Sequence, residues 1–229
     1  MSEQPVHHVT IEGVIGVGKT SLARALAHHW GGQLVPEEVE ENPFLPDFYK
    51  DPRRYAFQTQ LFFLLSRYRQ LKGLIQRDIF RPLLVCDYLF QKDKIFASIN
   101  LDDHEMALYD QVLPLLEREI PQPDRVVFLQ ASLATLLKRI EKRGRHFERD
   151  MSPEYLETLM EAYNHFFIHY SDAPLLIVNT DHVDFTQSAG HVEELARRIL
   201  DQRAGTSYYA PVESGDLFEG GAGRPSRGG

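Results

Sequence analysis

Apolar and polar positions alternate along the chain in two patterns, short continuous apolar runs and longer amphipathic stretches. The apolar runs predict buried strands, at residues 9–14, 33–35, 83–86, 125–131 and 175–179. Between them, apolar residues with helical spacing predict helices, at residues 21–30, 53–77, 92–99, 104–118, 132–143, 152–167 and 187–203. Strands that alternate with helices are typical of a parallel sheet covered by helices. The pattern therefore predicts an α/β fold with a five-stranded parallel sheet flanked by helices.

Capping residues support the starts of two of these helices. Ser132 follows an apolar run directly and is a good N-cap for the stretch behind it. Ser152 and Pro153 form an N-cap and first-turn pair, because proline is tolerated where a helix N–H has no partner. Both serines are therefore predicted to accept hydrogen bonds from backbone N–H groups of the first helical turn.

The same pattern divides the chain into one domain and a tail. A length of 229 residues is enough for a single domain with a full core. We place this domain at residues 1–203. Over residues 204–229 the apolar spacing is lost and the composition becomes rich in glycine, so we predict a disordered tail there.

Composition and charge exclude several classes of protein. A formal net charge of -8 argues against a broad electrostatic nucleic-acid binder, which needs an excess of Lys and Arg. The single cysteine, Cys86, excludes an internal disulfide framework and a cysteine zinc site. No apolar run approaches the roughly 18 residues of a membrane helix, and residues 1–8 carry no secretory signal pattern. We therefore expect a cytoplasmic protein that binds neither nucleic acid nor membrane.

A phosphate-binding loop connects the first predicted strand to the first predicted helix. It matches the pattern G-x-x-x-x-G-K-[ST] and consists of Gly13, Val14, Ile15, Gly16, Val17, Gly18, Lys19 and Thr20. The glycines let backbone N–H groups turn inward around phosphate oxygens at the positive end of a helix. Lys19 can reach the β- and γ-phosphates, and the Thr20 hydroxyl can bind Mg²⁺. The loop predicts that ATP or GTP is bound, and it leaves the acceptor open.

Four further motifs follow this loop in order. They are Pro36-Glu37-Glu38-Val39-Glu40, Phe48-Tyr49-Lys50-Asp51-Pro52, Gln58-Thr59-Gln60-Leu61-Phe62-Phe63 and Lys142-Arg143-Gly144-Arg145. Over residues 8–200 the chain thereby resembles the deoxynucleoside kinase family, particularly its bacterial deoxyadenosine/deoxyguanosine kinase-like members. The resemblance implies a P-loop NTPase-type fold with a helical lid. It also implies transfer of the γ-phosphoryl of ATP to the 5′-hydroxyl of a deoxynucleoside, purine preferred, in nucleotide salvage.

The resemblance assigns three residues to the acceptor site. Glu37 matches the glutamate that accepts the 5′-hydroxyl proton, although Glu38 stands where the family pattern E-P-V-E has proline. Tyr49 matches the tyrosine that binds the sugar 3′-hydroxyl. Gln60 matches the glutamine that pairs with the base edge, since an amide offers both a donor and an acceptor. The plainer alternatives are a solvated acidic run at residues 37–41 and a helical glutamine that faces water.

The motif after the third predicted strand departs from the family. The family has an acidic residue followed by arginine, and this chain has Asp87 followed by Tyr88. Asp87 is expected to organise Mg²⁺ and the substrate beside Thr20. Either Lys92 or Lys94 supplies the missing positive charge, or this branch does without it.

The resemblance also implies a lid at about residues 143–150. Arg143 and Arg145 match the family's R-x-R pair, which balances the charge of the transferring phosphoryl group. Glu148 matches a lid glutamate that meets the 3′-hydroxyl. Arg139 and Lys142 are interpreted as a solvated helix end, and residues 179–185 are expected to border the adenine of ATP.

Two other functions remain open at this stage, and so does the assembly. A nucleoside monophosphate kinase of the thymidylate kinase type shares the loop and lid, but it needs fixed arginines for the acceptor phosphate. A non-catalytic P-loop nucleotide sensor is the second alternative. The resemblance further implies a homodimer, and the helices at residues 53–77 and 104–118 are the expected interface.

Overall fold

The computed structural model describes residues 6–75, 83–148, 151–185 and 189–211. Its centre is a parallel sheet of six strands in the order β2-β3-β1-β4-β5-β6. The strands are β1 (His8–Gly13), β2 (Gln33–Val35), β3 (Leu84–Cys86), β4 (Arg125–Gln130), β5 (Leu175–Asn179) and β6 (Thr206–Tyr209).

The predicted parallel α/β sheet is confirmed, but the predicted count of five strands is wrong. Thr206–Tyr209 lies in the segment assigned to the tail, yet it pairs with β5 as a sixth strand. This edge strand has no buried residue, so it lacks the apolar run that revealed the other strands. Residues 212–229, the rest of the predicted tail, lie outside the described residues.

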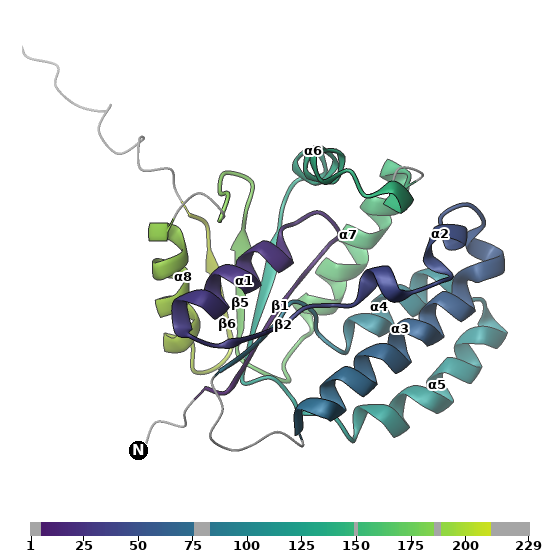
Figure 1. Cartoon of the computed structure of the whole chain (residues 1–229), viewed down its shortest axis with the longest axis horizontal. Coiled ribbons are helices and arrows are strands. Elements are labelled where there is room, and N and C mark those ends of the chain that lie inside the picture. Colours follow the sequence, from purple (N-terminus) through teal and green to yellow (C-terminus); the bar gives the residue numbers. More distant parts are fainter. Residues whose placement is uncertain (1–5, 76–82, 149–150, 186–188, 212–229) are drawn as a thin grey trace, which may run out of the picture.

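Helices cover both faces of the sheet (Figure 1). They are α1 (Lys19–Trp30), α2 (Leu45–Phe48), α3 (Pro52–Ile75), α4 (Lys92–Asn100), α5 (Asp103–Glu117), α6 (Leu133–Arg143), α7 (Pro153–Ile168) and α8 (Ala189–Asp201), with short 3-10 turns η1 (Val39–Glu41) and η2 (His146–Glu148). The helices α1 and α8 pack together on one face, and α3, α4, α5 and α7 form the layer on the other. In the described ranges, no helix combines the length and the apolar character that crossing a bilayer requires.

Both predicted serine caps are present. The Ser132 hydroxyl accepts a hydrogen bond from Thr135 N at 3.3 Å, and the Ser152 hydroxyl accepts one from Tyr155 N at 3.1 Å. Each cap satisfies an N–H group that has no partner inside the helix. These caps fix where α6 and α7 begin, and α6 leads directly into the predicted lid.

The core lies between the sheet and its two helical layers. The inward side chains of the central strands are fully buried, including Val9, Ile11, Val127 and Leu129. Because all strands are parallel, their carboxyl ends meet at one edge of the sheet, which is where ligands bind in open α/β folds. The loops after β1, β2 and β3 therefore bring the phosphate-binding loop, Glu37 and Asp87 together.

Candidate active site

The phosphate-binding loop runs from the end of β1 into α1 and requires glycine at two positions. Gly13 has φ 151°, and a Cβ there would lie 2.5 Å from the Leu129 carbonyl oxygen. Gly16 has φ 87°, and a Cβ there would lie 2.8 Å from a side-chain carbon of Ile140. The loop thus packs directly against β4 and α6, and larger residues would force it away.

Lys19 and Thr20 lie where this loop enters the helix. The Lys19 ammonium donates to the carbonyl oxygens of Gly13 at 2.6 Å and Val14 at 3.3 Å. Burial, together with the positive charge of Lys92, lowers the pKa of Lys19 to about 8. The Thr20 hydroxyl donates to the Asp87 carboxylate.

Asp87 also connects the phosphate-binding loop to the segment that carries Glu37. Its second carboxylate oxygen accepts the backbone N–H of Glu37 at 2.6 Å. Asp87 is buried at the end of β3, which is the neighbour of β1 in the sheet. A single carboxylate therefore fixes the distance between Thr20 and Glu37.

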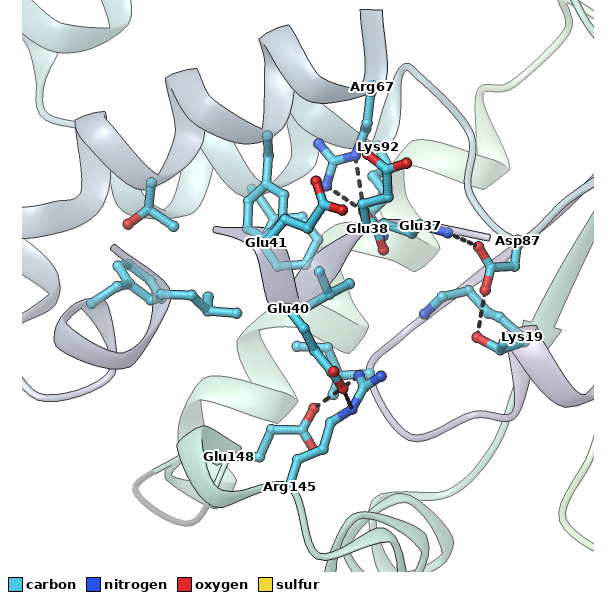
Figure 2. Close-up of a pocket in the computed structure, with 18 of the residues that line it drawn as sticks. Lys19, Glu37, Glu38, Glu40, Glu41, Arg67, Asp87, Lys92, Arg145 and Glu148 are labelled. Carbon is cyan, nitrogen blue, oxygen red and sulfur yellow. Dashed lines mark hydrogen bonds and ion pairs between the residues drawn. The ribbon is translucent and has the colours of Figure 1, made fainter. Parts of the chain in front are cut away.

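The Glu37 carboxylate lies between two cations (Figure 2). Its Oε1 accepts from Arg67 Nε at 2.9 Å and Nη2 at 2.6 Å, and its Oε2 accepts from Lys92 Nζ at 2.7 Å. Burial would raise the pKa of Glu37, but the charges of Lys92 and Arg67 outweigh burial and hold the pKa well below its usual range. Glu37 is therefore ionised and can accept a proton.

The exposed fractions of the side chains show which glutamate of the acidic segment, residues 37–41, lies inside the site. The Glu37 side chain is 10% exposed, whereas that of Glu40 is 71% exposed and lies 3.4 Å from Arg145. Glu37 is thus the carboxylate placed beside the phosphate-binding loop. Glu40 lies beside the lid residues Arg145 and Glu148 (Figure 2).

Arg67 and Asp93 are site residues that the sequence analysis missed. Arg67 donates to Glu37 on one side and to the Asp93 carboxylate on the other. Asp93 is fully buried, and it also accepts from Gln60 and from the Tyr109 hydroxyl. The sequence did contain a signal for Arg67. It lies two helical turns after Gln60, so the two side chains share one face of α3.

Gln60 and Tyr49 form the deeper wall of the site. Gln60 is 4% exposed, so the alternative that it faces water is wrong. Its Nε2 donates to the main-chain oxygen of Asp93 at 2.8 Å, which holds the amide in place. Tyr49 is also within the wall, and burial and the neighbouring Tyr155 and Glu148 raise its pKa, so the phenol stays protonated.

The lid residues form ion pairs above this wall. Arg143 donates to both carboxylate oxygens of Glu148, at 2.5 and 3.2 Å. Arg145 lies 3.8 Å from the same carboxylate. Residues 149–150, the end of the predicted lid, lie outside the described residues.

Arg139 is not a solvated residue, and that prediction is wrong. Its guanidinium donates to Val17 O at 3.0 Å, to Val183 O at 3.1 Å, and to both the hydroxyl and the carbonyl oxygen of Thr180. It thereby ties α6 to the phosphate-binding loop and to the loop after β5. The sequence did not show that these two loops meet.

The structure separates the two lysines proposed to replace the missing arginine. Lys92 contacts Glu37, whereas Lys94 lies 3.2 Å from Glu117 and is 43% exposed. The Tyr88 hydroxyl points elsewhere and donates to Gln70 Oε1 at 2.6 Å. Lys92 is therefore the lysine that supplies the positive charge at the site.

Two cavities meet at this group of residues. A cavity of about 500 Å³ contains all the predicted acceptor and lid residues, namely Lys19, Thr20, Glu37, Tyr49, Gln60, Asp87, Arg143, Arg145 and Glu148. A second hollow of about 470 Å³ lies over the phosphate-binding loop and extends to Val183–Phe185. The residues that line both are Lys19, Thr20, Arg143 and Arg145. Three cations and a hydroxyl at the junction of two cavities suit the passage of a phosphoryl group from one to the other.

Comparison with known proteins agrees with this geometry. The family model described as deoxynucleoside kinase matches residues 9–202. The chain belongs to the deoxynucleoside kinase family. It is therefore an ATP-dependent phosphotransferase that acts on deoxynucleosides, and the resemblance drawn from its motifs is confirmed.

Similar proteins match this kinase over most of their length. It is 36% identical over 198 residues to the deoxyguanosine kinase of Bacillus subtilis (strain 168), covering 84% of this chain and 96% of that protein. It is 32% identical over 205 residues to a deoxyadenosine kinase of Lactobacillus acidophilus, covering 83% and 94%. A solved structure of deoxyadenosine kinase from M. mycoides with bound dATP superposes with a TM-score of 0.71 at 28% identity, covering 85% and 99%.

Proposed function

We propose that this deoxynucleoside kinase transfers the γ-phosphoryl of ATP to the 5′-hydroxyl of purine deoxynucleosides, as a step of nucleotide salvage in the cytoplasm. The observation that carries the proposal is the junction of the two cavities, where Glu37 on the acceptor side faces Lys19 on the donor side. The purine preference is supported by the names of the relatives, a deoxyguanosine kinase and a deoxyadenosine kinase.

On the acceptor side, Glu37 is the general base. Its ionised carboxylate accepts the proton of the 5′-hydroxyl while the new oxygen–phosphorus bond forms. Tyr49 and Glu148 hold the sugar through its 3′-hydroxyl. Gln60 lines the cavity and holds the edge of the base through its amide oxygen, because its amide nitrogen donates to the main-chain oxygen and the carboxylate of Asp93.

On the donor side, the phosphate-binding loop holds the phosphates of ATP. Lys19 pairs with the β- and γ-phosphates. To do so, its ammonium gives up its hydrogen bonds to the carbonyl oxygens of Gly13 and Val14. Arg143 and Arg145 balance the charge that spreads over the transferring phosphoryl group. The neighbouring loop at residues 183–185 borders the adenine, since it lines the donor hollow.

The same site has the residues for Mg²⁺. The Thr20 hydroxyl and the Asp87 carboxylate lie within hydrogen-bond distance of each other beside the phosphate-binding loop. Oxygen ligands of this kind suit Mg²⁺, which is held in such sites by one or two side chains together with phosphates and water. Bound Mg²⁺ would neutralise phosphate charge there.

A substrate panel tests the proposed reaction. With ATP and Mg²⁺, the purified protein is expected to phosphorylate deoxyadenosine or deoxyguanosine with a higher kcat/KM than deoxycytidine or thymidine. Phosphorylation of deoxynucleoside monophosphates, with no activity on free deoxynucleosides, would favour the monophosphate kinase instead. Binding of ATP without any turnover would favour the nucleotide sensor.

The lid is tested by Arg145→Ala. Loss of a cation that stabilises the transferring phosphoryl group is expected to lower kcat by about a hundredfold. The matched control is Lys138→Ala, which removes an exposed cation of the same helical region and is expected to leave kcat unchanged. Full turnover by the Arg145 variant would remove Arg145 from the catalytic residues.

The proposed homodimer uses α3 and α5, which lie side by side at the edge away from α1 and α8 (Figure 1). Leu65, Leu108 and Leu115 on these helices are 39%, 49% and 65% exposed. Leu108 and Leu115 are two helical turns apart and share one face of α5, and exposed apolar side chains that share a face are typical of an interface. Light scattering at micromolar concentration is expected to give twice the chain mass of 26.4 kDa. Leu115→Glu is expected to lower that mass, and a wild-type monomer would contradict the proposal.

A further inference from the structure

The Lys92 ammonium is a buried cation with unused hydrogen-bonding capacity. Lys92 is the first residue of α4 and is 4% exposed, with its Nζ 2.7 Å from Glu37 Oε2. Within the part of the chain that the structure describes, Glu37 is the only hydrogen-bond acceptor of this ammonium. An ammonium carries three N–H donors, and leaving them without acceptors in a buried site is costly. Because Lys92 lines the cavity, its remaining donors are placed to bind a ligand there.

Arg67, the other cation at Glu37, is held differently. Its Nε and Nη2 both donate to Glu37, and its Nη1 donates to Asp93. Asp93 is fully buried and also binds Gln60, so Arg67 keeps a carboxylate partner even when Glu37 is neutral. Arg67 is thus held by two carboxylates. Among the described residues, Lys92 has one carboxylate partner, Glu37, and its ammonium also lies 5.8 Å from the centroid of the Phe96 ring.

The position of Lys92 relates it to the donor side of the site. Lys92 and Lys19 line the same cavity, and Asp87 lies in that lining as well. The two ammonium groups are close enough for the charge of Lys92 to lower the pKa of Lys19. Figure 2 shows Lys92 and Lys19 on the two sides of Glu37. A phosphoryl group that moves from the phosphate-binding loop toward Glu37 thus passes from one lysine to the other.

We propose that Lys92 is a catalytic residue whose ammonium binds the phosphoryl group as it arrives on the 5′-oxygen of the acceptor. The inference rests on the proposed role of Glu37 as the base. In that step the hydroxyl proton moves to Glu37 and the bond between the 5′-oxygen and phosphorus forms. The bond from phosphorus to the oxygen that bridges the β- and γ-phosphates breaks, and ADP keeps that electron pair.

The charges of this step explain why Lys92 favours the transition state. Glu37 becomes neutral as it takes the proton, so Lys92 loses its counter-ion. At the same moment the phosphoryl group brings negative charge within reach of the Lys92 donors. The ammonium therefore exchanges one anion for another, and its interaction with the phosphoryl group is stronger in the transition state and product than in the starting complex.

The test compares Lys92→Met with Lys94→Met. Lys94 lies two residues further on α4, is 43% exposed and pairs with Glu117, so its loss removes the same charge outside the cavity. For Lys92→Met we expect kcat to fall about tenfold to a hundredfold. By calorimetry, the Kd of the deoxynucleoside is expected to change less than about threefold, while the Kd of its 5′-monophosphate rises about tenfold or more. Lys94→Met is expected to match the wild type in all three.

The two binding constants separate catalysis from support of Glu37. A residue that only holds Glu37 in place would alter the affinities for nucleoside and monophosphate equally, and that result would overturn the proposal. Unchanged monophosphate affinity would overturn it too. Lys92→Arg retains the positive charge, so it is expected to keep affinity for the monophosphate and serves as the second variant where the methionine variant does not fold. The affinity for the monophosphate is measured without turnover. A wild type that phosphorylated no deoxynucleoside would contradict the proposed function, and the monophosphate affinities would still test the role of Lys92.

Discussion

Replacing Glu37 with glutamine is expected to lower kcat by about a hundredfold to ten-thousandfold, the usual contribution of a positioned general base. Glutamine keeps the size of the side chain and one oxygen acceptor for Arg67, but it cannot take the 5′-hydroxyl proton. The affinity for the deoxynucleoside is expected to change far less, because other residues of the cavity, Tyr49 and Gln60, are proposed to hold the sugar and the base. Steady-state kinetics and calorimetry with the same deoxynucleoside measure the two effects.

Glu40→Gln is the matched control for this variant. The Glu40 side chain is 71% exposed, and its contact with Arg145 is a surface ion pair, which contributes at most about 1 kcal/mol. The kcat of Glu40→Gln is therefore expected to stay within about fivefold of the wild type. If Glu40→Gln lost activity and Glu37→Gln kept it, the base would be Glu40. Full activity in both variants would show that neither carboxylate is the base.

The sequence predicted those parts of the site that follow strands directly. The phosphate-binding loop, Glu37 and Asp87 come after the first three strands, and parallel strands bring such loops to one edge of the sheet. The motif order then indicated the family and pointed to Tyr49 and Gln60, which the structure places in the lining of the same cavity. These positions were predictable because local sequence and strand direction determine them.

Residues whose role depends on a distant partner were not predictable in the same way. Arg67 lies on α3, where apolar residues occupy several faces, so periodicity did not show which face meets Glu37, 30 residues earlier in the chain. Asp93 was hidden for the same reason, since its partners lie on α3 and α5. Arg139 looked like one more cation at a helix end until its contacts with two loops were known. Strand β6 escaped because an exposed edge strand needs no apolar run.

Lys19→Ala is expected to lower kcat by about a thousandfold, because it removes the cation that pairs with the phosphates on the donor side. The fold is expected to survive, since the Lys19 ammonium contacts only loop carbonyl oxygens among the described residues. Circular dichroism and thermal unfolding check the fold, and kinetics at saturating deoxynucleoside check the turnover. A folded variant with wild-type turnover would exclude Lys19 from the reaction.

The pH dependence gives an independent test of the same residue. Burial and the charge of Lys92 lower the pKa of Lys19 to about 8, so in the free enzyme this ammonium loses its proton as the pH rises through about 8. The neutral amine attracts phosphate less, and kcat/KM for ATP is therefore expected to fall on the alkaline side of pH 8. Bound phosphates favour the charged form, so the corresponding limb in kcat is expected at higher pH. Lys19→Arg stays protonated throughout, and its kcat/KM is expected to be lower overall but without this alkaline limb. If the limb persisted in the arginine variant, it would belong to a different group.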